Sequence, residues 1–138
     1  MITEKSCGAI VYTKESGNIE YVIIRSNEGI YGFPKGHMEE NESETETALR
    51  EVAEEVGLTI TLISEFRSED TYTFIRNGET RLKHVVYFLG EYFAQTPTAQ
   101  EAELSGVYLM DYETAFSVFQ YENSKRLLTE AHNYIMQI

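Results

Sequence analysis

The sequence predicts an α/β fold, an α/β/α sandwich around a mixed β-sheet, and three observations support this class. Runs rich in β-branched and aromatic residues, typical of strands, occur both before and after a helical segment. Apolar residues at helical spacing return near the carboxyl terminus. The chain has 138 residues, near the usual size of a single domain with its own hydrophobic core. We therefore expect one domain over residues 1–138.

The main strands are expected at residues 6–13, 20–26, 59–75 and 81–93. A turn at residues 15–18 separates the first two, and residues 76–79, which contain Asn77-Gly78, separate the last two. Asn-Gly is a strong hairpin signal because both residues tolerate positive φ. A shorter strand is expected at residues 106–110.

One helix is predicted between the two pairs of strands, over residues 44–56. Ser43 and Glu46 indicate its start, because they form a capping box that satisfies backbone N–H groups. Gly57 indicates its end, since glycine suits the left-handed position after a helix, and Leu58 can supply the accompanying apolar contact. The apolar residues expected to face the sheet are Ala48, Leu49, Val52 and Val56.

Two further helices are expected near the carboxyl terminus. Asp111 can cap a short helix with the apolar residues Tyr112, Ala115, Phe116 and Phe119. The final helix places four apolar residues on one face, Leu127, Leu128, Ala131 and Ile135. Helices before and after the long strands can cover both faces of the sheet.

An acidic strip borders the apolar face of the 44–56 helix. It consists of Glu51, Glu54 and Glu55, whose like charges oppose helix stability by roughly 0.2–0.5 kcal/mol per pair. A solvated acidic face is the ordinary interpretation of such a helix. However, Arg50 stands beside the strip and can hold one carboxylate with a bidentate bond. Hard divalent cations take carboxylate and carbonyl oxygens as ligands, so the strip and the Gly36 carbonyl predict a metal site.

Charge and composition exclude several classes of function. The formal net charge of −12 argues against nucleic-acid and membrane-surface binding, because both partners are polyanions. An anionic phosphate substrate is compatible with this charge only if divalent metal accompanies it. The single Cys7 cannot form an internal disulfide, and we expect a small buried thiol. With no apolar membrane span and no export leader, the expected location is the cytoplasm.

The spacing of these charged residues resembles the signature of the Nudix hydrolases at every defined position. Gly36 is followed after five residues by Glu42, and after seven more by Arg50-Glu51. The remaining signature positions are Val52, Glu54, Glu55, Gly57 and Leu58. The resemblance implies the Nudix fold and metal-dependent hydrolysis of a nucleoside diphosphate linked to another group.

The resemblance also implies roles for the signature residues. Glu51, Glu54 and Glu55, with the Gly36 carbonyl, would hold Mg²⁺ or Mn²⁺. Glu51 or Glu55 would take a proton from the attacking water, and the sequence leaves open which one is the base. Arg50 would orient Glu51, and Glu42 would brace the loop against the helix.

Two flanking phrases resemble one branch of the family, the hydrolases that split diadenosine tetraphosphate into ATP and AMP. The phrases are Phe33-Pro34-Lys35-Gly36-His37 and Lys83-His84-Val85-Val86-Tyr87. The resemblance implies that Lys35, His37 and Lys83 face the phosphate chain and that Tyr87 stacks on adenine. Simpler interpretations stay open: an exposed loop position for His37, a strand-edge charge for Lys83, and a core position for Tyr87.

A further acid is expected from the loop before the last strand. Family members often supply one carboxylate from such a loop, which makes Glu103 the better candidate metal ligand and Glu101 the second. Leu109 stands where the branch commonly has Trp, and Asn41 stands where the family usually has Gly. Asn can still adopt the left-handed conformation, so we expect the loop to keep its shape.

The sequence therefore favours a small-molecule nucleotide substrate, with diadenosine tetraphosphate first. Within hydrolases the alternatives are an oxidised or non-standard nucleoside triphosphate, a triphosphorylated RNA 5′ end, and a nucleotide sugar. A non-catalytic nucleotide sensor is the alternative from another class. Sensors usually lack one or more signature acids, and all of them are present here.

Overall fold

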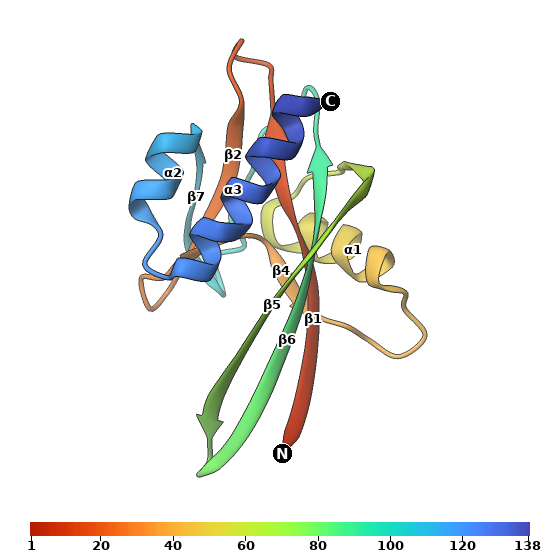
Figure 1. Ribbon diagram of the computed structural model, residues 1–138, viewed down its shortest axis with the longest axis vertical. Coiled ribbons are helices and arrows are strands. Elements are labelled where there is room, and N and C mark those ends of the chain that lie inside the picture. The colour runs from red at the N-terminus through yellow and green to blue at the C-terminus, as the bar shows by residue number, and fades with distance from the viewer.

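The computed structural model describes residues 1–138 apart from the side chain of Ser64, and its strands form one mixed sheet between helices (Figure 1). The sheet has seven strands in the order β3-β2-β1-β6-β5, with β4 on β1 and β7 on β2. The parallel pair is β1 with β6, and the other pairs are antiparallel. The strand bounds are β1 Ile2–Thr13, β2 Glu20–Ser26, β3 Tyr31–Gly32, β4 Lys35–His37, β5 Thr61–Arg76, β6 Glu79–Glu91 and β7 Leu104–Met110.

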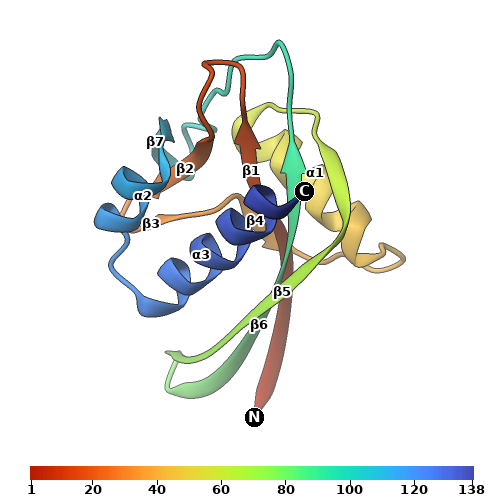
Figure 2. The same ribbon diagram turned by 45° about the horizontal axis from the view of Figure 1, so that its top comes forward.

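Helices cover both faces of this sheet, which confirms the predicted sandwich (Figures 1 and 2). The helix α1 (Glu44–Val56) lies on one face, and α2 (Tyr112–Val118) and α3 (Glu122–Gln137) lie on the other. Each face has its own apolar core. On the α3 face, Leu127, Leu128 and Ala131 pack against residues of β1, β2 and β6. On the α1 face, Val52 and Val56 pack against the opposite side chains of the same sheet.

Several elements begin and end at the residues that local sequence signals predicted. Helix 44–56 and strand 20–26 have the predicted bounds, and the last helix buries its four predicted apolar residues. The turn between β5 and β6 places Asn77 and Gly78 at φ 53° and 75°, as the Asn-Gly signal requires. Asp111 caps α2 by accepting from the Thr114 amide at 2.9 Å. No helix in the described part of the chain is long and apolar enough to cross a membrane.

Other bounds differ because they depend on distant pairing. Strand β1 begins four residues before the predicted start, since residues 2–5 pair in parallel with residues 81–84 of β6. The short strands β3 and β4 were not predicted, and they form where the loop after β2 crosses its neighbours. The hairpin of β5 and β6 projects beyond the body of the sheet, beside the amino-terminal end of β1 (Figures 1 and 2).

The buried face of α1 is shifted relative to the predicted one. Ala48, Val52 and Val56 are fully buried as predicted, but Leu49 is 39% exposed, and its predicted place in the stripe is wrong. The helix instead buries Thr47 and Glu55 on the other side of that stripe. A helix turns about 100° per residue, so this rotation directs part of the acidic strip toward the sheet.

Candidate active site

Local hydrogen bonds fix the loop that leads into α1. Ser43 Oγ accepts from the Glu46 amide at 3.2 Å, and Glu46 Oε1 accepts from the Ser43 amide at 2.8 Å, which completes the predicted capping box. Asn41 has a φ of 70°, so it adopts the left-handed conformation expected of it. Glu42 joins loop to helix, because its Oε1 accepts from the Glu39 amide at 3.0 Å and from Thr47 Oγ1 at 2.9 Å.

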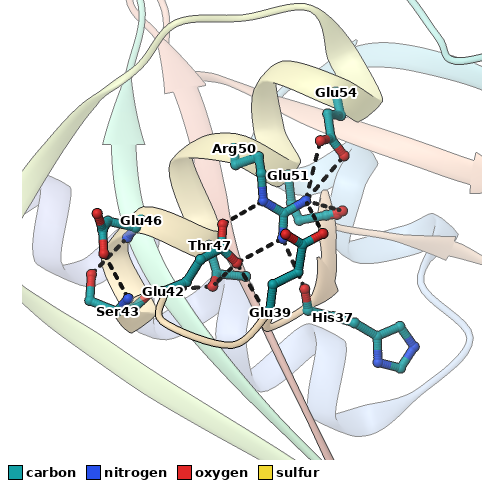
Figure 3. A network of polar contacts seen from close by, with 9 residues as sticks. All are labelled: His37, Glu39, Glu42, Ser43, Glu46, Thr47, Arg50, Glu51 and Glu54. Atoms are coloured by element: carbon teal, nitrogen blue, oxygen red, sulfur yellow. Dashed lines mark hydrogen bonds and ion pairs between the residues drawn. The ribbon is translucent and has the colours of Figure 1, made fainter.

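Arg50 lies at the centre of a network between the loop and the helix (Figure 3). Its Nε and Nη2 donate to the two oxygens of Glu42 at 2.6 and 2.9 Å. Its Nη2 also donates to the His37 carbonyl at 3.0 Å, and its Nη1 donates to both oxygens of Glu54 at 3.2 Å. The predicted contact with Glu51 is an ion pair at 3.6 Å. These bonds hold the pKa of Glu42 near 2, mainly through Arg50.

Glu55 is an acid placed inside the protein. Only 8% of it is exposed, and its Oε1 accepts from the Lys35 backbone amide at 3.0 Å. Burial raises its pKa to about 7, although the bond from Lys35 opposes the shift. The carboxyl group can therefore gain or lose a proton near neutral pH.

Glu51 lies beside Glu55 with one oxygen unused. Its Oε2 is buried and has no hydrogen-bond partner among the residues that the structure describes. Burial raises its pKa, and Arg50 opposes this shift. The backbone of Gly36 lies so close that a Cβ added there would overlap the Glu51 carboxylate. Glycine at this position thus allows β4 to approach the acidic helix.

The predicted further acid also lies near this pair. The amide of Gln100 donates to the Glu55 carbonyl at 3.0 Å, which ties the segment before β7 to the end of α1. Glu103, three residues later, is exposed and is close enough for its charge to raise the pKa of both Glu51 and Glu55. Glu101 is exposed in the same turn.

These residues fit a divalent cation. A positive ion would satisfy the unpaired Glu51 oxygen and relieve the repulsion among Glu51, Glu55 and Glu103. In the described part of the chain, no three His, Cys, Asp or Glu side chains already converge as a metal-binding group. Glu54, for example, points to Arg50 and would have to turn to bind an ion beside Glu51.

A cleft of about 720 Å³ lies on the α3 face of the sheet. Its aromatic lining comes from four elements or their flanks: Tyr31, Phe33, Tyr72, Phe74, Tyr87 and Tyr121. Lys35 also lines it, and the amide of the same residue binds Glu55, so the cleft adjoins the acidic helix. The sequence analysis did not identify Tyr72, Phe74 or Tyr121. Alternation of Tyr72 and Phe74 along β5 was the available signal.

The predicted stacking residue forms the floor of this cleft. Tyr87 is 5% exposed and packs edge-on against Phe33, with ring centres 5.6 Å apart. It therefore belongs to the core as well as to the cleft. Tyr72, at 39% exposed, and the exposed Tyr121 offer more open ring surface.

The three predicted phosphate-facing residues share one neighbourhood. Lys83 is buried with its Nζ 3.7 Å from Glu4 Oε1, and burial and the charge of Lys35 lower its pKa. Because β6 lies between β1 and β5, Lys83 is not a strand-edge charge. His37 is exposed, and its ring points away from the Arg50 network (Figure 3). Partial desolvation and the charge of Lys83 lower the pKa of His37, which places it near this group. Cys7 is fully buried, as predicted, and burial raises its pKa to about 11.

Known proteins resemble this chain over nearly its whole length. The family model described as NUDIX domain matches residues 3–131. The asymmetrical bis(5′-nucleosyl)-tetraphosphatases of Mus musculus and Sus scrofa are 29% and 28% identical, each over 95% of both chains.

Solved structures agree on the fold. A Caenorhabditis elegans Ap4A hydrolase, in a binary complex, superposes with a TM-score of 0.84 at 23% identity, covering 98% of this chain and 99% of that one. The dihydroneopterin triphosphate pyrophosphohydrolase of Escherichia coli gives a TM-score of 0.73 at 17% identity, covering 96% and 99%. At these identities the superpositions establish the fold alone.

Proposed function

The chain belongs to the Nudix hydrolase family, and from that premise we propose that it hydrolyses diadenosine tetraphosphate to ATP and AMP. The observation that carries the proposal is the aromatic cleft beside the acidic helix. Lys35 connects the cleft with the acidic helix. The residue lines the cleft, and its backbone amide donates a hydrogen bond to Glu55. Relatives that match 95% of this chain bear the name of that activity.

The chemistry assigned to the acidic helix is metal-assisted hydrolysis of a phosphoanhydride. Glu51, Glu54, Glu55 and Glu103, with the Gly36 carbonyl, would hold Mg²⁺ or Mn²⁺. The bound ion supplies neutralisation of phosphate oxygens and acidifies water. Glu55, with a pKa of about 7, is suited to accept the proton of the attacking water, and Glu51 is the other candidate.

Other side chains position the reacting groups. Arg50 and Glu42 fix the loop that carries Gly36. Lys35, which lines the cleft, and the buried Lys83 provide positive charge for the phosphate chain. Tyr72 and Tyr121 offer rings to a nucleobase, a contact worth roughly 1–3 kcal/mol per base.

Hydrolysis of a nucleotide panel in Mg²⁺, with products separated by chromatography, tests the proposal. We expect diadenosine tetraphosphate to be cleaved more efficiently than ATP or 8-oxo-dGTP, giving ATP and AMP. In labelled water, the label should enter the same product in every turnover, because one water position is set by the site. Two ADP as products, or a preferred mononucleotide, would contradict the substrate while leaving the family assignment intact.

Comparison with a metal-free reaction separates enzyme from sensor. A catalytic domain should lose hydrolysis when EDTA replaces Mg²⁺ and regain it when Mg²⁺ returns. A nucleotide sensor would bind members of the panel without product formation in either condition.

A further inference from the structure

Three cationic side chains converge on one carboxylate near the turn of the β5–β6 hairpin. Arg76 Nη1 and Arg81 Nη1 lie 3.2 and 3.0 Å from Glu4 Oε2, and Lys83 Nζ lies 3.7 Å from Glu4 Oε1. We call Arg76, Arg81 and Lys83 the basic cluster. Glu4 lies beneath it with its side chain 12% exposed, whereas that of Arg76 is 54% exposed.

Strand register places the basic cluster on the same face of the sheet as the aromatic cleft. Glu4 is the partner of Lys83, and on the other side of β6 Tyr72 is the partner of Lys83 and Phe74 of Arg81. Directly opposed residues in a sheet share a face. The guanidinium of Arg76 lies over the Phe74 ring, 5.0 Å from its centre. The cluster therefore continues the cleft from Tyr72 and Phe74 toward the hairpin tip.

The basic cluster carries more positive charge than its acidic neighbours neutralise, and one of its hydrogen-bond donors is unpaired among the described residues. Its acidic contacts are Glu4 and the exposed Glu79, which lies 3.2 Å from Arg81 Nη2, so three cations face two carboxylates. Arg81 Nε is buried without a hydrogen-bond partner among the described residues. The pairs of Glu4 with Arg81 and Lys83 are largely buried, and the cost of removing these charges from water offsets much of their attraction, so stability alone gives weak reason for this arrangement. In a chain of net charge −12, such a positive region favours an anionic ligand.

We propose that the basic cluster is a second phosphate subsite, which binds the part of the polyphosphate chain farther from the acidic helix. This inference rests on the proposed function, because it assigns a longer phosphate chain to the same cleft. A short chain held near Lys35 and Glu55 would leave the arginines unused, whereas a longer one reaches them. The subsite thus selects for chain length. Glu4 is a positioning residue, since it holds the three cations together from below.

Binding of inorganic tetrapolyphosphate, which has as many phosphates as the proposed substrate, tests the subsite without hydrolysis of a nucleotide when it is measured by calorimetry at fixed Mg²⁺. Arg76→Gln and Arg81→Gln should each weaken binding about tenfold, as expected for loss of one charge-assisted hydrogen bond. Arg81→Lys should retain most of the affinity because it keeps the charge. The matched control is Arg67→Gln. Arg67 is on the same strand but pairs with Glu44 and Glu69 on the α1 side, and its loss should change binding little.

The kinetic counterpart is chain-length selectivity. Arg76→Gln and Arg81→Gln should raise KM for diadenosine tetraphosphate more than for ATP, with kcat nearly unchanged. Thermal unfolding of each variant shows whether it is folded, and the test rests on Arg76→Gln if Arg81→Gln does not fold.

The outcomes separate this inference from the proposed function. Weaker tetrapolyphosphate binding in both Gln variants, but not in Arg67→Gln, supports the subsite even if no dinucleotide is hydrolysed. Equal binding in all variants, or no measurable binding by the wild type, overturns the subsite even if diadenosine tetraphosphate proves to be the substrate.

Discussion

Replacing Glu55 with Gln should stabilise the metal-free protein above neutral pH while removing its activity. In the folded protein the pKa of Glu55 is about 7, against an ordinary value of 4.5. Below pH 4.5 the group is protonated in both states and its charge imposes no cost. As pH rises through 7 the folded protein must hold a buried carboxylate, so stability is lost. A pKa that rises from 4.5 to about 7, at about 1.36 kcal/mol per pH unit, lowers the free energy of unfolding above neutral pH by about 3 kcal/mol.

Gln keeps the oxygen that accepts from the Lys35 amide and carries no charge. Urea unfolding in EDTA, at about pH 5 and about pH 8, should therefore show a gain for Glu55→Gln over the wild type only at the higher pH. The matched control is Glu54→Gln. Glu54 is exposed on the same helix and should give no such gain. Mg²⁺ should reduce the stability gain of Glu55→Gln, because the ion binds to the folded wild type and stabilises it.

Two results would refute this reasoning. One is a difference in unfolding free energy between the wild type and Glu55→Gln, measured in EDTA, that is the same at both pH values. Glu55 would then be charged without cost. The other is full turnover by Glu55→Gln at saturating Mg²⁺, which would remove Glu55 from the reaction.

Three further predictions concern neighbouring residues. Glu54→Gln should lower turnover by at least about two orders of magnitude without loss of helix signal in circular dichroism, because its carboxylate serves metal binding; near-normal turnover would exclude it as a ligand. Gly36→Ala should lower kcat and reduce the free energy of unfolding in urea by about 1–3 kcal/mol, because the added methyl displaces the Glu51 carboxylate. Unchanged kcat and stability would mean that β4 moves freely. Tyr72→Ala should raise the Kd for an adenine nucleotide in calorimetry about tenfold, while Tyr72→Phe should not, because stacking uses the ring; equal effects would indicate a role for the hydroxyl.

The parts of the site that the sequence predicted are those determined by short-range chemistry. The bounds of α1 follow from Ser43, Glu46 and Gly57, which satisfy backbone groups within one helical turn. The same local pattern predicted the Asn77-Gly78 turn. Each of these signals acts over a few residues, so no knowledge of the rest of the fold is needed.

The missed parts depend on how distant segments meet. Tyr72 and Tyr121 line one cleft because β5 and the start of α3 are neighbours in space. The exposure of Leu49 and the burial of Glu55 follow from the rotation of α1 about its axis relative to the sheet. Helical spacing alone does not determine this rotation to within one residue. Glu4 carried no motif, and only the parallel register of β1 with β6 brings it to Lys83.

That parallel register has a consequence for how the protein is made. Strand β1 is the first element of the chain, yet its longest pairing is with β6, which ends at Glu91. On the ribosome, α1 and the loop with Gly36 emerge while β1 still has one open edge. Long-range parallel pairing is slow because a long loop must close first. The nascent amino-terminal half thus presents an unpaired strand edge until β6 arrives, and this interval is when aggregation or chaperone binding would compete with folding.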